Sequence, residues 1–533
     1  MKPKTSLIPG LFLILKLQTS GNIKQVMKIL PVALIREADR YTIINEPIAS
    51  IDLMERAAGR CFVWLKQYHR AEYSYYIFCG TGNNGGDGLA IARMALEEGW
   101  EVKTFILRLS TKESADFETN LGRLKEVGSP SITEIINESD FPEIPQGTVI
   151  IEALFGTGLT RPLAGLALEL IRHLNACPNI RISIDVPSGL FVDESMLLAN
   201  AEAVRADYTL SFNPPKLCFM MAENDPWVGR WIRLDIGLHP EFIARAETPY
   251  HFTETDDLKP LYRKRRRFEH KGNFGHALLI AGSRQKAGAA LLAARGCLAA
   301  GTGLLTVHSV VPVIEALNIV LQEAMASLTD NPDEVCDLPS LSPYNAIAVG
   351  PGLGTGNGAS AMLRLLIQEC QVPIVLDADA LNIISENKTW LAFLPQNSIL
   401  TPHPKEFERL AGKASNDHER LEMARDFAFR FQVYVVLKGG VTAVVTPQKK
   451  VFFNSTGNPG LATGGSGDVL TGIIAGLLAQ GYHPQDAARL GVWLHGASAD
   501  LALETESMET LLPSTLPKYM RRAWKILTGE SSF

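Results

Sequence analysis

No apolar stretch of the 533-residue sequence reaches the roughly 18 residues that a membrane-spanning helix requires. The best candidate, residues 7–15, is interrupted by Pro9 and Gly10. A basic excess is also missing, because 51 lysines and arginines stand against 57 aspartates and glutamates, for a formal net charge of −6. Since nucleic-acid binders neutralise phosphates with a basic surface, we predict neither a nucleic-acid nor a membrane partner.

Cysteine is scarce and scattered. The sequence has seven cysteines, and none of them forms a C-x-x-C pair. An odd number at these spacings argues against a disulfide framework or a cysteine-rich zinc site. We therefore expect a reducing compartment, the cytoplasm.

The sequence predicts an N-terminal leader and one boundary between two domains. Residues 1–26 carry Lys2 and Lys4 ahead of an apolar stretch without a clear cleavage site, and Met27 is a plausible second start. We predict that residues 1–26 are a leader or a mis-assigned start, and disordered. Residues 245–270 are polar and then basic, so we predict domains at 27–247 and 248–533. The basic run 263–267 fits a solvated linker, a segment touching a phosphate, or a nucleic-acid or targeting signal.

Short apolar runs alternate with amphipathic stretches on both sides of this boundary. The runs are 75–79, 102–107, 149–151, 182–184 and 208–212, then 277–280, 304–307, 346–349, 374–376 and 434–437. Continuous β-branched runs are typical of strands buried on both faces, and stretches such as 90–98 and 361–369 predict helices. We predict an α/β fold with two three-layer αβα domains, each on a parallel sheet.

A glycine-rich segment, residues 80–88, follows the first predicted strand. Gly80, Gly82 and Gly85 satisfy G-x-G-x-x-G, which brings a phosphate close to the backbone and to a helix N-terminus. A dehydrogenase of the Rossmann type also needs an acidic residue at the end of the second strand. That strand ends at Leu107-Arg108 instead, which disfavours a dehydrogenase. A simple tight turn remains an alternative.

Two more polar loops, residues 151–159 and 182–189, follow predicted strands. Asp185 is placed at a strand tip, where a carboxylate can do acid–base work. Oxygens of Asn84, Glu152 and Ser188 could surround a hard monovalent cation. Each residue is equally explained as a helix cap or turn former.

The segments Asn83–Gly88, Phe155–Gly158 and Asp185–Gly189 together resemble the YjeF N-terminal domain family, which includes the NAD(P)H-hydrate epimerase. The resemblance covers about residues 27–245 and implies a Rossmann-like domain that interconverts the R and S forms of hydrated NADH and NADPH. It implies a K⁺ ion on Asn84 and Ser188, with Glu152 where the family usually has aspartate. Asp185 would be catalytic. The hydrate would be bound by Asn83, Asn84, Gly85, Gly86, Asp87, Gly156, Thr157, Gly158, Leu159, Thr160, Arg161, Pro162 and Asp185.

The second half contains a longer glycine segment, residues 457–467, followed by Asp468 and the apolar run 469–478. Glycines before a helix form a nest of N–H groups for phosphate oxygens. Asp468 beside that nest can take a proton from a hydroxyl that attacks a phosphoryl group. No Walker A lysine is present, so the segment is not a P-loop. The alternative is a glycine-rich turn with Asp468 as a helix cap.

Further polar loops follow the other predicted strands, at 350–354, 377–382, 401–407 and 438–442. His403 lies between two prolines, which favours ligand contact, and Lys438 beside two glycines could meet a phosphate. Asp377 and Asp379 could bind Mg²⁺ directly or through water, or cap the next helix.

These loops resemble the YjeF C-terminal family of NAD(P)H-hydrate dehydratases, which is related to ribokinase-like kinases. The resemblance covers about residues 250–530 and implies a ribokinase-like domain that dehydrates the S hydrate with ADP and Mg²⁺, releasing AMP and phosphate. Asp468 would be catalytic, and His403, Asp468 and Gly352 or Gly354 would contact the hydrate. The nucleotide would be bound by Lys438, Gly439, Gly440, Val441, Thr442 and Gly467.

We therefore predict a homo-oligomeric, bifunctional metabolite-repair enzyme that acts on hydrated NADH or NADPH and on ADP. The alternative is a ribokinase-like small-molecule kinase, such as a vitamin kinase, with a non-catalytic nucleotide-binding N-terminal module. The identity of the product separates the two, because a kinase would release a stable phosphate ester.

Overall fold

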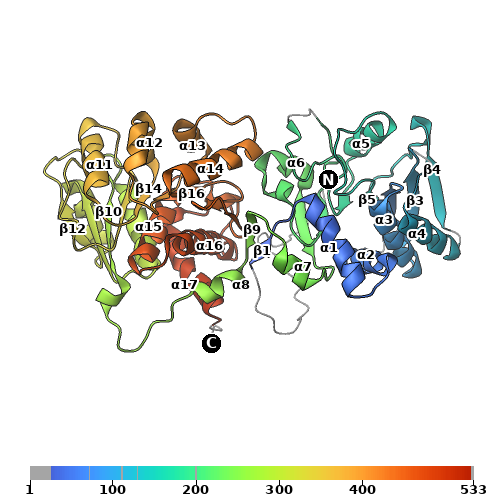
Figure 1. The fold of residues 1–533 in the computed structure, drawn as a ribbon, viewed down its shortest axis with the longest axis horizontal. Helices are drawn as coiled ribbons and strands as arrows, with labels where there is room; N and C mark the ends of the chain where they lie inside the picture. Colours follow the sequence, from blue (N-terminus) through green and yellow to red (C-terminus); the bar gives the residue numbers. More distant parts are fainter. Residues whose placement is uncertain (1–25, 71, 110–111, 129, 198–200, 530–533) are drawn as a thin grey trace. The chain divides into compact units, whose positions relative to one another are not determined.

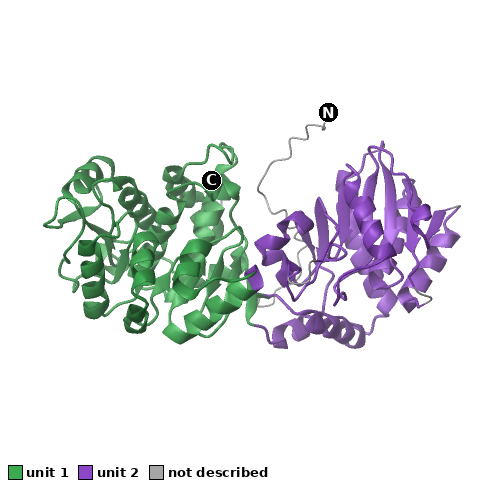
Figure 2. Ribbon diagram, turned by 90° about the horizontal axis from the view of Figure 1, so that it is seen from above, with its two compact units in different colours: residues 1–27, 249–415, 419–533 green, residues 28–248, 416–418 purple. Residues whose placement is uncertain are grey.

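The computed structural model describes residues 26–529, apart from 71, 110–111, 129 and 198–200 (Figure 1). The predicted leader or mis-assigned start therefore lies outside the described residues, except for Val26. The chain divides into two compact units (Figure 2). The N-terminal unit holds residues 28–248 and 416–418, and the C-terminal unit holds Met27, 249–415 and 419–533. None of the described helices is both long and apolar enough to cross a membrane.

The N-terminal unit is built on seven parallel strands in the spatial order β4-β3-β2-β5-β6-β7-β8. Their bounds are β2 (Ser74–Cys79), β3 (Glu101–Leu107), β4 (Ser131–Ile135), β5 (Val149–Ala153), β6 (Arg181–Ile184), β7 (Tyr208–Phe212) and β8 (Arg230–Leu234). Counted from β2, this is the doubly wound order 3-2-1-4-5-6, extended by one strand. The winding direction reverses between β2 and β5, so a crevice is expected at the carboxyl ends of these two strands.

Helices cover both faces of this sheet. Tyr75, Ile77 and Cys79 of β2 pack against a cluster that includes α2 (Ser50–Tyr68), α3 (Asn83–Glu97) and α4 (Ala115–Glu126). Tyr76 and Phe78 face the other way, onto α5 (Leu166–Ala176). Burial on both faces explains why the strand is apolar throughout. The remaining helices are α1 (Val32–Asn45), α6 (Asp225–Val228) and α7 (Pro240–Arg245).

The C-terminal unit carries an eleven-stranded sheet in the order β1-β9-β18-β17-β16-β15-β14-β13-β10-β11-β12. The strands are β1 (Met27–Lys28), β9 (Tyr250–Thr253), β10 (His276–Ile280), β11 (Leu304–Ser309), β12 (Met325–Leu328), β13 (Ala346–Val349), β14 (Ile374–Leu376), β15 (Ile399–Leu400), β16 (Tyr434–Leu437), β17 (Ala443–Val445) and β18 (Val451–Asn454). From β12 to β16 every neighbour is parallel. β17 runs antiparallel to both β16 and β18.

Figure 1 shows α11, α12 and α13 on one side of this sheet and α15, α16 and α17 on the other. The helices are α8 (Thr255–Leu258), α9 (Ala287–Ala299), α10 (Val311–Val320), α11 (Asn357–Glu369), α12 (Ala378–Glu386), α13 (Pro404–Ala411), α14 (Asp417–Phe431), α15 (Ser466–Ala479), α16 (Pro484–Ala502) and α17 (Leu516–Thr528). α15 lies against α9 so closely that a Cβ on Gly472 would collide with the carbonyl oxygen of Ala293. This close approach fixes the helix that begins with the Gly-Ser-Gly-Asp motif.

The predicted α/β class with helices on both faces of parallel strands is confirmed, and all ten predicted strands are present. The prediction of a parallel sheet in the second half is confirmed from β12 to β16, but the strand β17, which was not predicted, adds antiparallel neighbours. Short turns at residues 438–442 and 446–450 return the chain directly, and only antiparallel neighbours can be joined that way.

Candidate active sites

In the N-terminal unit, the loops after β2 and β5 meet at the point where the winding reverses. A Cβ on Gly80 would collide with the carbonyl oxygen of Leu154, so only glycine fits between the two strand ends. The side chain of Asn84 lies beside Gly156, where an added Cβ would be 3.4 Å from it. The predicted glycine motif and the predicted Gly156 loop are therefore brought together.

The segment that we predicted as a loop is largely helical. α3 begins at Asn83, so residues 83–88 form its first turns, and only Asn83 of these is exposed. Gly85 is required because a Cβ there would collide with the carbonyl oxygen of Gly80. The Nδ2 atom of buried Asn84 has no hydrogen-bond partner among the described residues.

Glu152 and Ser188 tie the ends of β5 and β6 together. The Ser188 hydroxyl donates to Glu152 Oε2 at 2.6 Å, and the Ser188 N–H donates to Glu152 Oε1 at 2.9 Å. The Ser188 hydroxyl oxygen in turn accepts from the Phe155 N–H at 2.7 Å. Burial raises the pKa of Glu152, although the Ser188 bonds act against that rise. In the described part of the chain this fully buried carboxylate contacts no basic side chain, so its charge is uncompensated.

Asp185 lies at the tip of β6, as predicted, and is paired with a residue that the sequence reasoning missed. The Lys216 ammonium donates to Asp185 Oδ1 at 2.7 Å and to the Phe212 carbonyl oxygen, and its side chain is 1% exposed. Lys216 follows the predicted strand 208–212 by four residues. A search for polar residues just after predicted strands, which identified the other loops, would have found Lys216 as well.

Two more carboxyl groups face Asp185. Burial and Asp185 raise the pKa of Asp39, on α1, to about 6. Burial, Asp185 and Asp39 raise the pKa of Asp87 well above its usual range. No motif marks Asp39, because its helix lies before the first strand of the sheet.

The second predicted loop of this unit, residues 156–162, is more open. Gly158, Thr160, Arg161 and Pro162 are exposed, and Gly156, Thr157 and Leu159 are half-buried. A Cβ on Gly158 would lie 3.0 Å from a guanidinium nitrogen of Arg36 on α1. The backbone of Gly158 and the guanidinium group of Arg36 therefore lie at the same edge of the site.

In the C-terminal unit, Asp468 lies in the first turn of α15. Gly465 precedes this helix with a φ of 98°, a left-handed conformation that favours glycine. A Cβ on Gly467 would lie 3.2 Å from Lys438 Nζ, so an anion at this turn would meet both the helix N-terminus and an ammonium group. Burial and Asp377 raise the pKa of Asp468 to about 7, while Lys438 acts in the opposite direction.

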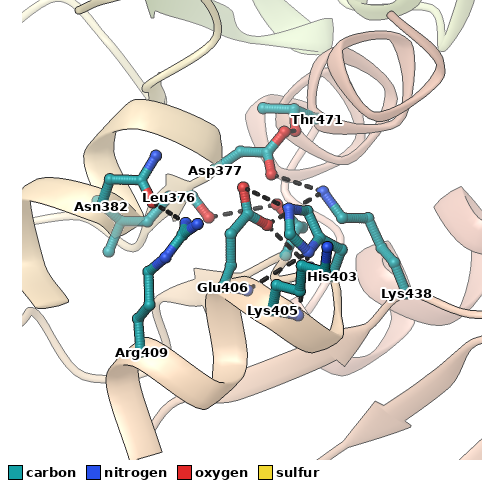
Figure 3. Close-up of polar contacts among 10 residues, drawn as sticks. Leu376, Asp377, Asn382, His403, Lys405, Glu406, Arg409, Lys438 and Thr471 are labelled. Carbon is teal, nitrogen blue, oxygen red and sulfur yellow. Dashed lines mark hydrogen bonds and ion pairs between the residues drawn. The ribbon is translucent and has the colours of Figure 1, made fainter. Parts of the chain in front are cut away.

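Lys438 is held by a buried carboxylate (Figure 3). Its Nζ donates to Asp377 Oδ1 at 2.8 Å, and the Thr471 hydroxyl on α15 donates to Asp377 Oδ2 at 2.7 Å. The Glu406 carboxylate lies 3.9 Å from the same Nζ. The pKa of Lys438 is raised, because Asp377 and Glu406 outweigh the effect of burial.

Of the two alternatives that we considered for Asp377, the helix cap is wrong, and Mg²⁺ binding stays a prediction. Asp377 precedes α12 but makes no capping bond to that helix, and both of its oxygens bind the side chains named above. Asp379 is also engaged, since its Oδ2 accepts from Lys286 Nζ and the Gly354 N–H. Among the described residues no group of three or more His, Cys, Asp or Glu side chains is arranged to hold a metal ion.

His403 caps the start of α13. Its Nδ1 accepts from the N–H groups of Lys405 and Glu406, and its own N–H donates to Glu406. Burial lowers the pKa of His403. A neutral ring whose Nδ1 accepts must carry its proton on Nε2, which lies 3.5 Å from Glu406 Oε1 on a side chain that is 45% exposed.

The other predicted contacts come from neighbouring strand ends. Gly352, after β13, has a φ of 61° and packs against Lys286 and Ala289, while Gly354 is held by Asp379. The turn between β16 and β17 presents Gly439 and Gly440 to solvent and leaves Val441 and Thr442 half-buried. The first turn of α15, which follows β18 in the chain, thus brings an anion nest and the Asp468 carboxyl group to the fixed ammonium group at the end of β16. Such a set can bind a phosphate and take a proton from a hydroxyl.

Two family models match the chain. Residues 50–218 match the model described as YjeF-related protein N-terminus, and residues 277–522 match the model described as NAD(P)H-hydrate dehydratase. The chain is 34% identical to the bifunctional NAD(P)H-hydrate repair enzyme Nnr of Thermofilum pendens, over 95% of this chain and 97% of that protein. It is 33% identical to the enzyme of the same name from Moorella thermoacetica, over 95% of this chain and 98% of the relative.

A solved structure also resembles one half of the chain. It is the ADP/ATP-dependent NAD(P)H-hydrate dehydratase of Bacillus subtilis, co-crystallized with ATP/Mg²⁺. The identity is 34%, the match covers 52% of this chain and 98% of that one, and the TM-score is 0.45.

Proposed function

The chain belongs to the family of bifunctional NAD(P)H-hydrate repair enzymes, and we infer that it repairs hydrated NADH and NADPH by epimerisation and dehydration. We assign the epimerase to residues 27–247 and the dehydratase to residues 248–533. The observation that carries this assignment is that each unit holds its own polar site at the carboxyl ends of parallel strands. The two family matches, at 50–218 and 277–522, support the same division.

In the dehydratase, Asp468 acts as the base. It takes the proton of the C6 hydroxyl of the S hydrate, and the hydroxyl oxygen attacks the β-phosphorus of ADP, so that AMP leaves. Phosphate is a far better leaving group than hydroxide. It departs with the electrons of the C6–O bond while C5 gives up a proton to water, and the C5=C6 double bond of the dihydropyridine ring is restored. The raised pKa of Asp468, about 7, supports this role, because a general base works best when its pKa is close to the working pH.

The surroundings of Asp468 supply the anion binding that this reaction needs. The Gly464–Gly467 turn and Lys438 offset charge on the transferring phosphoryl group, and the Lys438–Thr442 turn, with Gly439 and Gly440 exposed, contacts the nucleotide. The Nε2–H of His403 orients the hydrate beside Gly352 and Gly354. Mg²⁺ supplies charge neutralisation when it is bound with the nucleotide. Asp377 and Asp379, which bind Lys438, Thr471 and Lys286 in this structure, would be its nearest carboxylates.

In the epimerase, Asp185 is the acid–base group. The C6 carbon of the hydrate carries both a hydroxyl group and the ring nitrogen, so inversion requires one bond at C6 to break and re-form, with a proton moved each way. The Asp185–Lys216 pair and the Gly156–Pro162 loop surround the place for this chemistry. Asn83 to Asp87 provide the other side of the pocket.

A K⁺ ion in this unit is part of the proposal. Asn84, Glu152 and Ser188 would hold it, and it would orient the ends of β2, β5 and β6. Hard oxygen donors suit K⁺, and the uncompensated charge of Glu152 supports a cation there. The expected result is faster R-to-S conversion in K⁺ than in Na⁺ at equal ionic strength, with a matching rise in thermal stability.

The seven cysteines are all free thiols, which supports a cytoplasmic location. The reaction itself is tested by product analysis with the purified S hydrate, ADP and Mg²⁺. Restored absorbance at 340 nm together with equal amounts of AMP and phosphate is expected. A stable phosphorylated hydrate would contradict the proposal and favour a small-molecule kinase.

A further inference from the structure

The carboxylate of Asp377 is buried deep in the dehydratase unit, with its side chain 1% exposed. It connects two elements that are distant in sequence. One oxygen accepts from Lys438 at the end of β16, and the other accepts from Thr471, one turn into α15 after Asp468. A buried carboxylate with both oxygens bonded in this way is held in one position and holds its partners in turn.

The backbone beside Asp377 is strained. Ala378, the next residue, has a φ of 47°, a left-handed conformation that costs a non-glycine residue free energy. Asp377 does not recover that cost by capping α12, to which it makes no side-chain bond. The local conformation therefore presents the carboxylate toward Lys438 and Thr471.

The partner of Asp377 is the ammonium group closest to the anion nest. A Cβ added to Gly467 would lie 3.2 Å from Lys438 Nζ and 3.8 Å from Asp377 Oδ2. Glu406 lies on the other side of the ammonium group, at 3.9 Å. A long lysine side chain with such partners is confined to one rotamer, so its charge sits at one place beside the turn.

We propose that Asp377 is a positioning residue of the dehydratase, which holds the Lys438 ammonium against the Gly467 turn so that the nucleotide phosphate meets one fixed cation and Asp468 works inside a fixed set of charges. The proposal rests on the dehydratase function proposed above. It adds a role for Asp377 and Thr471, which act through Lys438.

The charges around Asp468 give this proposal a directional test. Asp377, Asp379 and Glu406 raise the pKa of Asp468, and Lys438 lowers it. Asp377→Asn removes one negative charge, but the amide keeps the shape and can still accept from Lys438 while Glu406 keeps the lysine charged. The pKa of Asp468 should then fall, and the acid limb of the activity profile should move to lower pH.

The experiment measures kcat/KM for the S hydrate from pH 5.5 to 9, and the KM for ADP, in the full-length chain. For Asp377→Asn we expect the midpoint of the acid limb to fall by about one pH unit, the size of effect that one nearby charge produces. The KM for ADP should rise about tenfold, because the ammonium is no longer held by a charged partner. Thr471→Val keeps every charge, so it should raise the KM for ADP without moving the midpoint.

Asp500→Asn is the matched control. Asp500 is also buried and hydrogen-bonded, to the Gly457 N–H and to Asn458, but it is not among the charges that act on Asp468. Its replacement should leave the midpoint in place. A midpoint that is unchanged or higher in Asp377→Asn, or an equal shift in Asp500→Asn, would overturn the proposal.

Failure of the underlying function gives a different result. If the wild-type chain converts no hydrate, the dehydratase assignment is refuted, and calorimetric titration with ADP then decides the role of Asp377. Weaker ADP binding in both Asp377→Asn and Thr471→Val supports the positioning role. Equal affinity in the wild type and both variants overturns it.

Discussion

Replacing Asp468 by asparagine should slow dehydration strongly and at the same time stabilise the fold at alkaline pH. The folded pKa of Asp468 is about 7, against 3.8 for an unperturbed aspartate. Between these values the unfolded chain has released a proton that the folded chain retains, so stability falls as the pH rises through this window. The loss is about 1.4 kcal/mol per pH unit and reaches at most about 4 kcal/mol above pH 7.

Asparagine cannot ionise, so Asp468→Asn removes that loss. We expect the variant to be more stable than the wild type by up to about 4 kcal/mol at pH 8, and by about 1.5 kcal/mol at pH 5. Urea unfolding at the two pH values measures the difference, and amide exchange along α15 assigns the transition to the C-terminal unit. Dehydration should fall by about 10²-fold or more, the usual loss when a general base is removed.

Asp337→Asn serves as a control of opposite sign. The pKa of Asp337 is lowered, because the Asp330 N–H and the Thr329 hydroxyl donate to its carboxylate. This variant should be less stable than the wild type at both pH values. The reasoning about Asp468 is refuted if Asp468→Asn is less stable than the wild type at pH 8, or if its stability difference does not depend on pH.

Three further outcomes are expected. Gly467→Ala should raise the KM for ADP about tenfold or more, because its Cβ would lie 3.2 Å from Lys438 Nζ, and titration calorimetry with ADP checks this. His403→Ala should raise the KM for the S hydrate and also cost about 1 kcal/mol of stability through the lost helix cap, whereas His403→Asn should show only the first effect, as steady-state kinetics and thermal melting will reveal. Asp185→Asn should slow R-to-S conversion by about 10²-fold without affecting dehydration of the S hydrate, measured by separating the epimers chromatographically.

A control variant and contradicting outcomes test these predictions. Gly288→Ala places the same methyl group in the first turn of α9, where nothing lies within 4 Å, and should bind ADP normally. Equal ADP affinity in Gly467→Ala would argue against an anion at that turn. Full R-to-S conversion in Asp185→Asn would leave the N-terminal unit without its assigned base.

Much of the fold could be predicted because strands buried on both faces are apolar throughout. The strands that were missed break this pattern for physical reasons. β4 and β12 lie at sheet edges and expose most of their residues, so their sequences are mixed. β15 has only two residues, and β17 and β18 form short antiparallel neighbours rather than separate βα units.

The sites were predictable only where a motif marks a strand end. Asp185 follows a predicted strand, His403 follows a short apolar run and Asp468 follows a glycine turn, and all three lie in the candidate sites. The Asp377–Thr471 bond joins residues 94 positions apart, and the strand order that brings them together is not written in local spacing. Asn83–Gly88 was read as a loop because glycine is a poor helix former. Tertiary packing overrides that preference, since a Cβ on Gly86 would lie 2.7 Å from Met54 Sδ and one on Gly88 would lie 2.8 Å from the Ala153 Cβ.

The central claim, that one chain repairs both epimers, is tested most directly by absorbance at 340 nm, where only the restored dihydronicotinamide absorbs. The purified chain is mixed with separated R and S hydrates of NADH in the presence of ADP and Mg²⁺, of ATP, or of no nucleotide. The account predicts full ADP-dependent recovery from both epimers. Recovery from the S hydrate alone, beyond its spontaneous supply, would reduce the N-terminal unit to a binding module, and no recovery from either would contradict the account.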